Sequence, residues 1–264
     1  MADTKNAGEI LKAVVEDGRE ELDRASLGLA FSGVAAGLNI SFSAVALAVV
    51  GALTGGVGLA AYLVYPLGFL IVILGKAQLY TENTVTPVTV ALTDPRIVPN
   101  MMRLWAVVFV ANVLGATLFS AVIVYGHILD PAALRILFEE VSHKAQYGFG
   151  VVFLKAIFGG WLVAMIAWLV AASQDTISQV FFVFSLAFLI PAAGLTHCIA
   201  GSSEFLISVF SGEETWGGYL GGFLVPTTLG NTVGGVILVA LLNYGQVMGS
   251  RAKTAFSGVT DRRD

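Results

Sequence analysis

Charged residues are scarce in this sequence and are missing altogether from long stretches of it. Asp, Glu, Lys and Arg make up 12% of the 264 residues, about half the share in a soluble domain. Each charge-free run is at least as long as the roughly 18 residues of a spanning helix; the runs are 25–75, 104–129, 156–174, 176–203 and 215–250. Backbone groups in lipid must be hydrogen-bonded within the chain, so these runs predict transmembrane helices and exclude a soluble protein.

Features typical of enzymes and secreted proteins are also lacking. The only cysteine is Cys198, so there is no disulfide framework and no thiolate metal site. His127, His143 and His197 are far apart and lack the spacing of metal ligands. No Ser/His/Asp arrangement or phosphate loop has a supporting context, and the polar stretch 1–9 does not read as a cleavable signal peptide. We therefore expect no enzyme activity, cofactor, metal or nucleic-acid partner.

The charge-free runs divide into six predicted spans. The first run is too long for one crossing, and Gly51, Gly55 and Gly56 mark the turn that splits it. The spans are 27–50, 57–90 (interrupted), 102–125, 149–172, 180–210 (interrupted) and 218–242. The predicted organisation is an amphipathic cytoplasmic helix in 1–26, a six-span domain in 27–245 and a basic, mostly flexible cytoplasmic tail in 246–264.

The basic residues predict the orientation of these spans. With both termini in the cytoplasm, Arg135 and Lys144 are the only basic residues in external loops. Cytoplasmic loops of membrane proteins carry an excess of Lys and Arg, so this distribution favours that orientation. Termini on the same side need an even number of spans, and six fits. Lys155, near the outer end of the fourth span, is expected to extend to the membrane interface. We expect the chain to lie in the bilayer of the plasma (inner) membrane.

The chain contains an internal repeat with a constant offset of 119 residues. The Phe-Leu-Ile of 69–71 recurs at 188–190, and the Asn-x-x-Gly that begins at Asn112 recurs at Asn231. Each unit holds three spans, so the second must enter the membrane upside down relative to the first; the units are about 27–126 and 147–245. Inverted repeats place the functional site at the bilayer midplane, between the halves.

The middle span of each unit is interrupted by polar residues. In the second span, the polar stretch 75–84 precedes Pro87, and in the fifth, Pro191 and Gly194 open a stretch that runs to Glu204. Non-helical backbone at membrane depth is tolerated only where protein or water covers it. Interruptions at corresponding positions of the two halves therefore predict a solute path.

Polar side chains at these interruptions are the candidate pore residues. His197 lies midway through the fifth span, where it either lines the pore or bonds carbonyls that the break exposes. Thr81, on the other interruption, either faces His197 or only packs. Lys76 and Glu82 flank that segment and either pair with each other or contact a solute. Glu204, two helical turns beyond His197, is expected to face a cytoplasmic vestibule or a subunit seam.

Short motifs at the interruptions resemble those of a known channel family. Leu79-Tyr80-Thr81, Leu195-Thr196-His197 and the paired Asn-x-x-Gly stretches are similar to the formate/nitrite transporter family, over nearly all of 27–244. The resemblance implies a pentamer in which each protomer has an aquaporin-like hourglass pore. It also implies two apolar constrictions around a central histidine, which bonds to the threonine of the second span. By motif matching, these are His197 and Thr81.

The same resemblance assigns further residues. One constriction would involve Phe69 and Tyr80, with Ile190 where the family often has an aromatic residue. Lys144 stands at the place of a vestibule lysine that family members carry before the fourth span.

Three departures from the family pattern indicate a divergent branch. Gly160 stands where the family commonly has asparagine, Tyr80 replaces the usual phenylalanine, and Glu82 follows the threonine directly. A carboxylate beside an anion path should repel anions unless Lys76 neutralises it.

These observations predict an all-helical membrane channel for a small monovalent anion or its conjugate weak acid, with a pH dependence that arises from His197. An aquaporin-type channel for neutral solutes is an alternative, although neither interruption has an Asn-Pro-Ala signature. An ammonium-type channel would need about eleven spans. A non-conducting sensor or scaffold with a degenerate pore is the alternative from another class.

Overall fold

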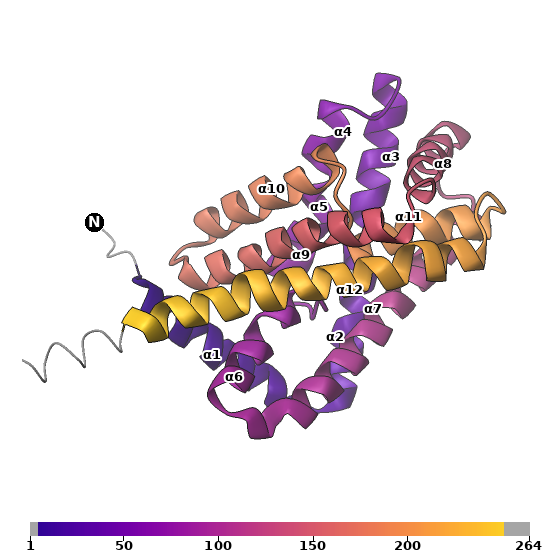
Figure 1. The fold of residues 1–264 in the computed structure, drawn as a ribbon. Coiled ribbons are helices and arrows are strands. Elements are labelled where there is room, and N and C mark those ends of the chain that lie inside the picture. The colour runs from indigo at the N-terminus through magenta and orange to yellow at the C-terminus, as the bar shows by residue number, and fades with distance from the viewer. Residues whose placement is uncertain (1–4, 251–264) are drawn as a thin grey trace, which may run out of the picture.

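In the computed structural model, which describes residues 5–250, every regular element is a helix (Figure 1). Four helices are long and apolar enough to cross a membrane: Ser26–Thr54, Pro95–Tyr125, Phe149–Ala172 and Gly218–Ser250. Shorter apolar helices cover Leu59–Leu74, Thr176–Ala192 and Cys198–Phe210. The architecture of the described residues is thus all-helical, as predicted.

Figure 1 labels the helices in chain order. They are α1 (Ala7–Asp23), α2 (Ser26–Ile40), α3 (Phe42–Thr54), α4 (Leu59–Val64), α5 (Pro66–Leu74), α6 (Thr86–Thr93), α7 (Val98–Tyr125), α8 (Pro131–Ala145), α9 (Phe149–Ala172), α10 (Thr176–Ala192), α11 (Cys198–Phe210) and α12 (Val225–Val233). Short 3-10 helices cover η1 (Glu82–Thr84) and η2 (Pro95–Ile97). Wider π-helical turns flank α12 at η3 (Gly218–Leu224) and η4 (Gly234–Leu241).

The boundaries differ from the sequence prediction at three places. The first long run does turn where predicted, because α3 ends at Thr54 and Gly55 follows with a φ of +80°, but Gly51 stays inside α3. The last helix continues to Ser250 instead of ending near residue 242, and residues 251–264 of the expected tail lie outside the described part. The segment between the third and fourth predicted spans holds a helix, α8, that the sequence analysis did not foresee.

Helix α1 packs along α6 and the end of α9. Its first turn is closed by a capping box, in which the side chains of Asn6 and Glu9 bond each other's backbone N–H groups. Its apolar face is buried, with Leu11 and Val14 packed in one cluster with Val85 and Trp168. The predicted amphipathic helix is therefore a docked part of the domain.

Two helix breaks lie inside the molecule. The second predicted span consists of α4 and α5, then irregular residues and the short η1, then α6. The fifth consists of α10 and α11, with residues 193–197 between them. These breaks expose backbone N–H and C=O groups that have no helical partner, and such groups need hydrogen bonds where water is excluded.

A buried asparagine satisfies the backbone at each break. Asn112, in α7, accepts from Tyr80 N–H at 2.8 Å and donates to the carbonyls of Gln78 and Gly33, both at 2.8 Å. Each bond joins α7 either to the first break or to α2. One side chain therefore fixes the break against a packed pair of helices.

Asn231, in the second half, has an equivalent set of bonds. It accepts from Cys198 N–H at 2.8 Å and donates to the carbonyls of Thr196 and Ala156 at 3.0 and 2.7 Å. The two asparagines that mark the sequence repeat thus hold the two breaks in the same manner.

A glycine on the neighbouring helix lies against each of these asparagines. A Cβ built on Gly37 would clash with the backbone of Asn112, and one built on Gly160 would clash with the backbone of Asn231. Gly160 was noted in the sequence as a departure from the family's asparagine. In the structure it is the residue that lets α9 approach α12.

We predict that Asn231→Leu destabilises the protein by about 3 kcal/mol or more, because three buried backbone groups lose their partners. Thermal unfolding in detergent measures the change. Asn243→Leu is the matched control, since among residues 5–250 the Asn243 side chain bonds only a carbonyl of its own helix, that of Val239. Equal unfolding temperatures for the two variants would contradict the role assigned to Asn231.

Candidate functional site

His197 and Thr81, one from each break, are joined by a buried hydrogen bond. Thr81 Oγ lies 2.8 Å from His197 Nε2, and neither residue has more than 1% of its surface exposed. His197 is also the N-cap of α11, where its Nδ1 accepts from Ala200 N–H at 3.1 Å. The two halves of the chain therefore meet at these two side chains.

The hydrogen bonds assign the protonation of the histidine ring. Because Nδ1 accepts from a backbone N–H, it carries no proton, and the neutral ring then carries its proton on Nε2. His197 Nε2–H donates to Thr81 Oγ. The hydroxyl hydrogen of Thr81 is then available to donate to a third group.

Apolar and aromatic side chains surround this pair. The ring of Phe69 meets that of His197 edge to face with 5.1 Å between centroids. Phe69 and Ile190 are both fully buried. Tyr80, expected at the same constriction, packs edge to face against Trp105 and Phe109, and its hydroxyl lies 2.8 Å from Thr232 Oγ.

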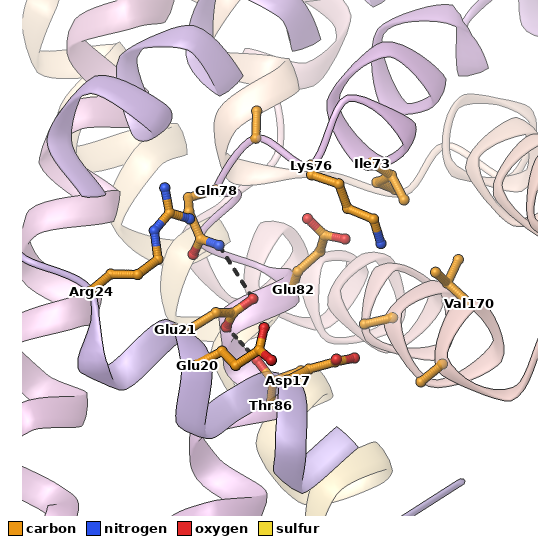
Figure 2. Close-up of a pocket in the computed structure, with 13 residues that line it drawn as sticks. Asp17, Glu20, Glu21, Arg24, Ile73, Lys76, Gln78, Glu82, Thr86 and Val170 are labelled. Carbon is orange, nitrogen blue, oxygen red and sulfur yellow. Dashed lines mark hydrogen bonds between the residues drawn. The ribbon is translucent and has the colours of Figure 1, made fainter. Parts of the chain in front are cut away.

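A cavity of about 340 Å³ lies between the first break and α1 (Figure 2). Lys76 and Glu82 line one side of it, and carboxylates of α1 line the other. The predicted alternative of a Lys76–Glu82 ion pair is not realised, because no salt bridge joins them in the described part of the chain. We name this space the α1-side cavity.

Glu21 connects α1 to the break. Its carboxylate accepts from Gln78 Nε2 at 3.2 Å and from Thr86 Oγ at 2.8 Å. Burial raises the pKa of Glu21 above its ordinary value of 4.5, and these two hydrogen bonds lower it in part. Burial likewise raises the pKa of the neighbouring Asp17. Docked α1 therefore binds protons more readily than free α1.

Lys144, the predicted vestibule lysine, is held by two carboxylates. It donates to Glu204, which is 1% exposed, and lies 3.7 Å from Glu140. Burial lowers the pKa of Lys144, but the two carboxylates outweigh this and leave it above its ordinary value. Lys144 closes α8 just before α9 begins, whereas the α1-side cavity is lined by the last residues of α9, so the two lie at opposite ends of that helix.

The structure gives partners to two further residues of the sequence analysis. Glu204, expected to face a cytoplasmic vestibule or a subunit seam, is buried and pairs with Lys144. Lys155, expected to extend to the interface, donates from its ammonium to the exposed Gly194 carbonyl at 2.9 Å and lies over the ring of Tyr147. Both contacts join residues distant in sequence, so no local pattern could have indicated them.

The sequence analysis also missed residues that build the site. Asn112 and Asn231 were read only as marks of the repeat, although an asparagine inside an apolar span already indicates a buried hydrogen-bonding task. Glu140 and the α1 carboxylates gave no signal of their own. They matter because the fold brings Glu140 to Lys144 and the α1 carboxylates to the α1-side cavity.

We predict that α1 docks more tightly at pH 5 than at pH 7. The pKa of Glu21 is higher when α1 is docked than when α1 is free. Protonation of Glu21 therefore favours docking as the pH falls through the raised pKa, and the gain in docking free energy is complete below the ordinary value of 4.5. Hydrogen exchange of α1 amides, corrected for intrinsic rates, measures the effect. Glu21→Gln should reduce the difference between the two pH values. Equal protection at both would show that these carboxylates do not govern docking.

The chain matches the formate/nitrite transporter family model over residues 8–245. It is 32% identical over 241 residues to the inner membrane protein YfdC of Escherichia coli K12, covering 88% of this chain and 76% of that protein. It is 28% identical over 235 residues to a probable formate transporter of Methanothermobacter thermautotrophicus, covering 79% and 85%.

Solved structures show the same fold. A channel described as an FNT family ion channel superposes with a TM-score of 0.80 at 20% identity, covering 89% of this chain and 97% of that one. A pentameric formate channel with formate bound superposes with a TM-score of 0.69 at 18% identity, covering 84% and 98%. The family match over nearly the whole described chain, the relatives and the shared fold lead to one conclusion: this protein is not an enzyme but a membrane protein of the formate/nitrite transporter family.

Proposed function

We propose that the chain is a channel that passes a small monovalent acid, of the formate class, through a pore at His197. In this proposal six spans form two inverted three-span repeats around an hourglass path, with both termini in the cytoplasm. The observation that carries it is the hydrogen bond between Thr81 and His197, which joins the two helix breaks in an apolar surrounding.

The apolar surrounding determines which species can cross. A bare anion that entered between side chains such as Phe69 and Ile190 would lose its hydration and gain no counter-ion, at a cost of many kcal/mol. The neutral conjugate acid avoids most of that cost. A pore of this kind therefore conducts the acid form, and its rate follows the fraction of solute that is protonated.

His197 and Thr81 supply hydrogen bonds at the narrow point. With Nε2–H donating to Thr81 Oγ, the threonine hydroxyl hydrogen can donate to a carboxyl or nitrite oxygen. The chain of donors polarises in one direction, which strengthens each bond. Because Nδ1 is engaged with Ala200 N–H, the ring keeps this orientation while solutes pass.

The oligomeric state is proposed from the similarity to the formate channel of known structure. The superposing formate channel is pentameric, and this chain exposes large apolar side chains along α7 and α9, among them Val110, Leu118, Leu154 and Phe158. Such faces suit contact with lipid or with neighbouring protomers. We propose a homopentamer in the plasma (inner) membrane, in which each protomer holds its own path.

A channel for neutral solutes is the second candidate. It is favoured by the state of Lys144, whose ammonium is paired with Glu204 and close to Glu140 and so offers an anion little attraction. The two candidates differ in pH dependence. Uptake of a neutral solute stays constant with pH, whereas uptake of a weak acid rises as the pH falls.

We predict that formate uptake into proteoliposomes rises about tenfold for each unit of pH decrease above the acid's own pKa, because the neutral fraction rises by that factor. His197→Asn should lower the uptake at least tenfold, since the ring no longer orients Thr81. Stopped-flow measurement with an internal pH dye reports both results, after subtraction of empty liposomes.

His143→Asn is the matched control for this experiment. His143 is exposed on α8, and its ring contacts that of Tyr147. Its variant should transport like the wild type. A His197→Asn protein that kept both its rate and its pH slope would show that the pore does not depend on this histidine.

A further inference from the structure

A further hydrogen bond joins the two halves of the chain next to the bond between Thr81 and His197. Tyr80, which precedes Thr81 in the first break, lies with its hydroxyl oxygen 2.8 Å from Thr232 Oγ in α12. Thr232 directly follows Asn231, whose side chain holds the second break. The bond therefore connects the neighbour of the proposed pore threonine with the neighbour of the asparagine that fixes the other break.

The bonds around Thr232 assign the direction of this contact. The Thr232 hydroxyl donates to the Thr228 carbonyl at 2.7 Å, one turn back in the same helix. Since a hydroxyl has a single hydrogen, Thr232 Oγ must accept from Tyr80. Loss of either hydroxyl therefore removes the link between the halves, whereas the Thr232 side chain keeps its bond to Thr228 when only the tyrosine hydroxyl is lost.

Helix α7 holds the ring of Tyr80 from another direction. Trp105 and Phe109 contact the ring edge to face, with 5.9 and 5.1 Å between ring centroids. The indole N–H of Trp105 in turn donates to the Asn83 carbonyl at 2.8 Å, three residues further along the break. Only 6% of the Tyr80 surface is exposed. The side chain thus bridges α7 and α12, and it restrains the first break against the second half.

We propose that the hydrogen bond between Tyr80 and Thr232 sets the size limit of the pore, so that acids larger than the formate class are disfavoured. The proposal rests on the proposed function and adds to it a residue pair that determines which acids pass. Tyr80 is a positioning residue in this role, because it holds Thr81 close to His197 instead of binding the solute.

A narrow passage selects by size only if its walls are held in place. Where the breaks meet, one wall is Thr81 of the first half and the other is His197 of the second half. A larger acid that wedges these walls apart must also stretch the bond between Tyr80 and Thr232, because residues 80 and 81 move together. A smaller acid passes without separating the walls. The bond therefore slows the larger acid by the factor that one neutral hydrogen bond contributes to a rate, about two- to tenfold.

The test compares the uptake of formate and propionate by proteoliposomes, at one pH and at equal concentrations of the neutral acid. Stopped-flow records with an internal pH dye give the two initial rates after subtraction of empty liposomes. Tyr80→Phe, Thr232→Val and the double variant each lack the bond but keep side chains of nearly the same volume. Thr232→Ser keeps the hydroxyl and is the conservative variant that should restore wild-type behaviour.

Ser203→Ala is the matched control, because Ser203 makes a bond of the same kind away from the breaks. Its hydroxyl oxygen lies 2.7 Å from Ser41 Oγ, and Ser41 itself donates to the Gly37 carbonyl, so Ser203 donates to Ser41. This bond also joins the two halves. Ser203, however, lies six residues beyond His197 in α11, about 9 Å along the helix axis.

We expect the propionate-to-formate ratio of rates to rise about two- to tenfold in Tyr80→Phe and in Thr232→Val. The double variant should show no larger rise, because both single changes remove one and the same bond. Thr232→Ser and Ser203→Ala should keep the wild-type ratio. Wild-type ratios in Tyr80→Phe and Thr232→Val would overturn the proposal, and so would a rise in only one of them or an equal rise in Ser203→Ala.

Formate uptake in the same vesicles shows that each variant is folded and inserted. If one single variant failed to fold, the other would still decide, since it removes the same bond from the opposite side. Absence of any acid uptake by the wild type would instead refute the proposed function itself.

Discussion

The constraint on which this structure depends is that backbone polar groups at membrane depth must find partners inside the protein. Two helices are broken near the middle of the molecule, and each break exposes N–H and C=O groups. Asn112 and Asn231 bond those groups and fasten each break to a packed helix pair. The close approach of the helices requires glycine at Gly37 and Gly160. Without these contacts, an irregular backbone in an apolar interior would cost more than the fold could offset.

The chemistry of the site follows from the same arrangement. A broken helix presents free N–H groups at the start of α11, and His197 Nδ1 accepts from one of them, that of Ala200. That bond determines the tautomer, the tautomer determines that Nε2 donates to Thr81, and Thr81 keeps a hydrogen to offer a solute. Capping of the backbone by His197 thus also orients a hydrogen-bond donor where the two breaks meet. Carboxylates accompany both lysines, Lys144 directly and Lys76 across the α1-side cavity.

Much of the fold could be predicted from the sequence because it depends on local patterns of residues. Charge-free runs indicated the helices, the polar interruptions indicated where they break, and Asn112 and Asn231 marked the repeat. The pairing of Lys144 with Glu204 could not be predicted, because it joins residues 60 positions apart and depends on how α8 folds back over α11. Helix α8 itself is amphipathic and partly charged, so it gave no hydropathy signal. The acidic α1-side cavity was missed because α1 looked like a surface helix, whereas its docking brings the carboxylates to Glu82.

The central claim is that solute crosses the His197–Thr81 point without net charge. The most direct test measures charge movement and proton movement together, on proteoliposomes adsorbed to a sensor membrane and exposed to a sudden formate gradient. The account predicts one proton taken up with each formate and no current above that of empty liposomes. A formate-driven current that grows with the amount of protein, without matching proton uptake, would contradict it and show that the anion itself crosses.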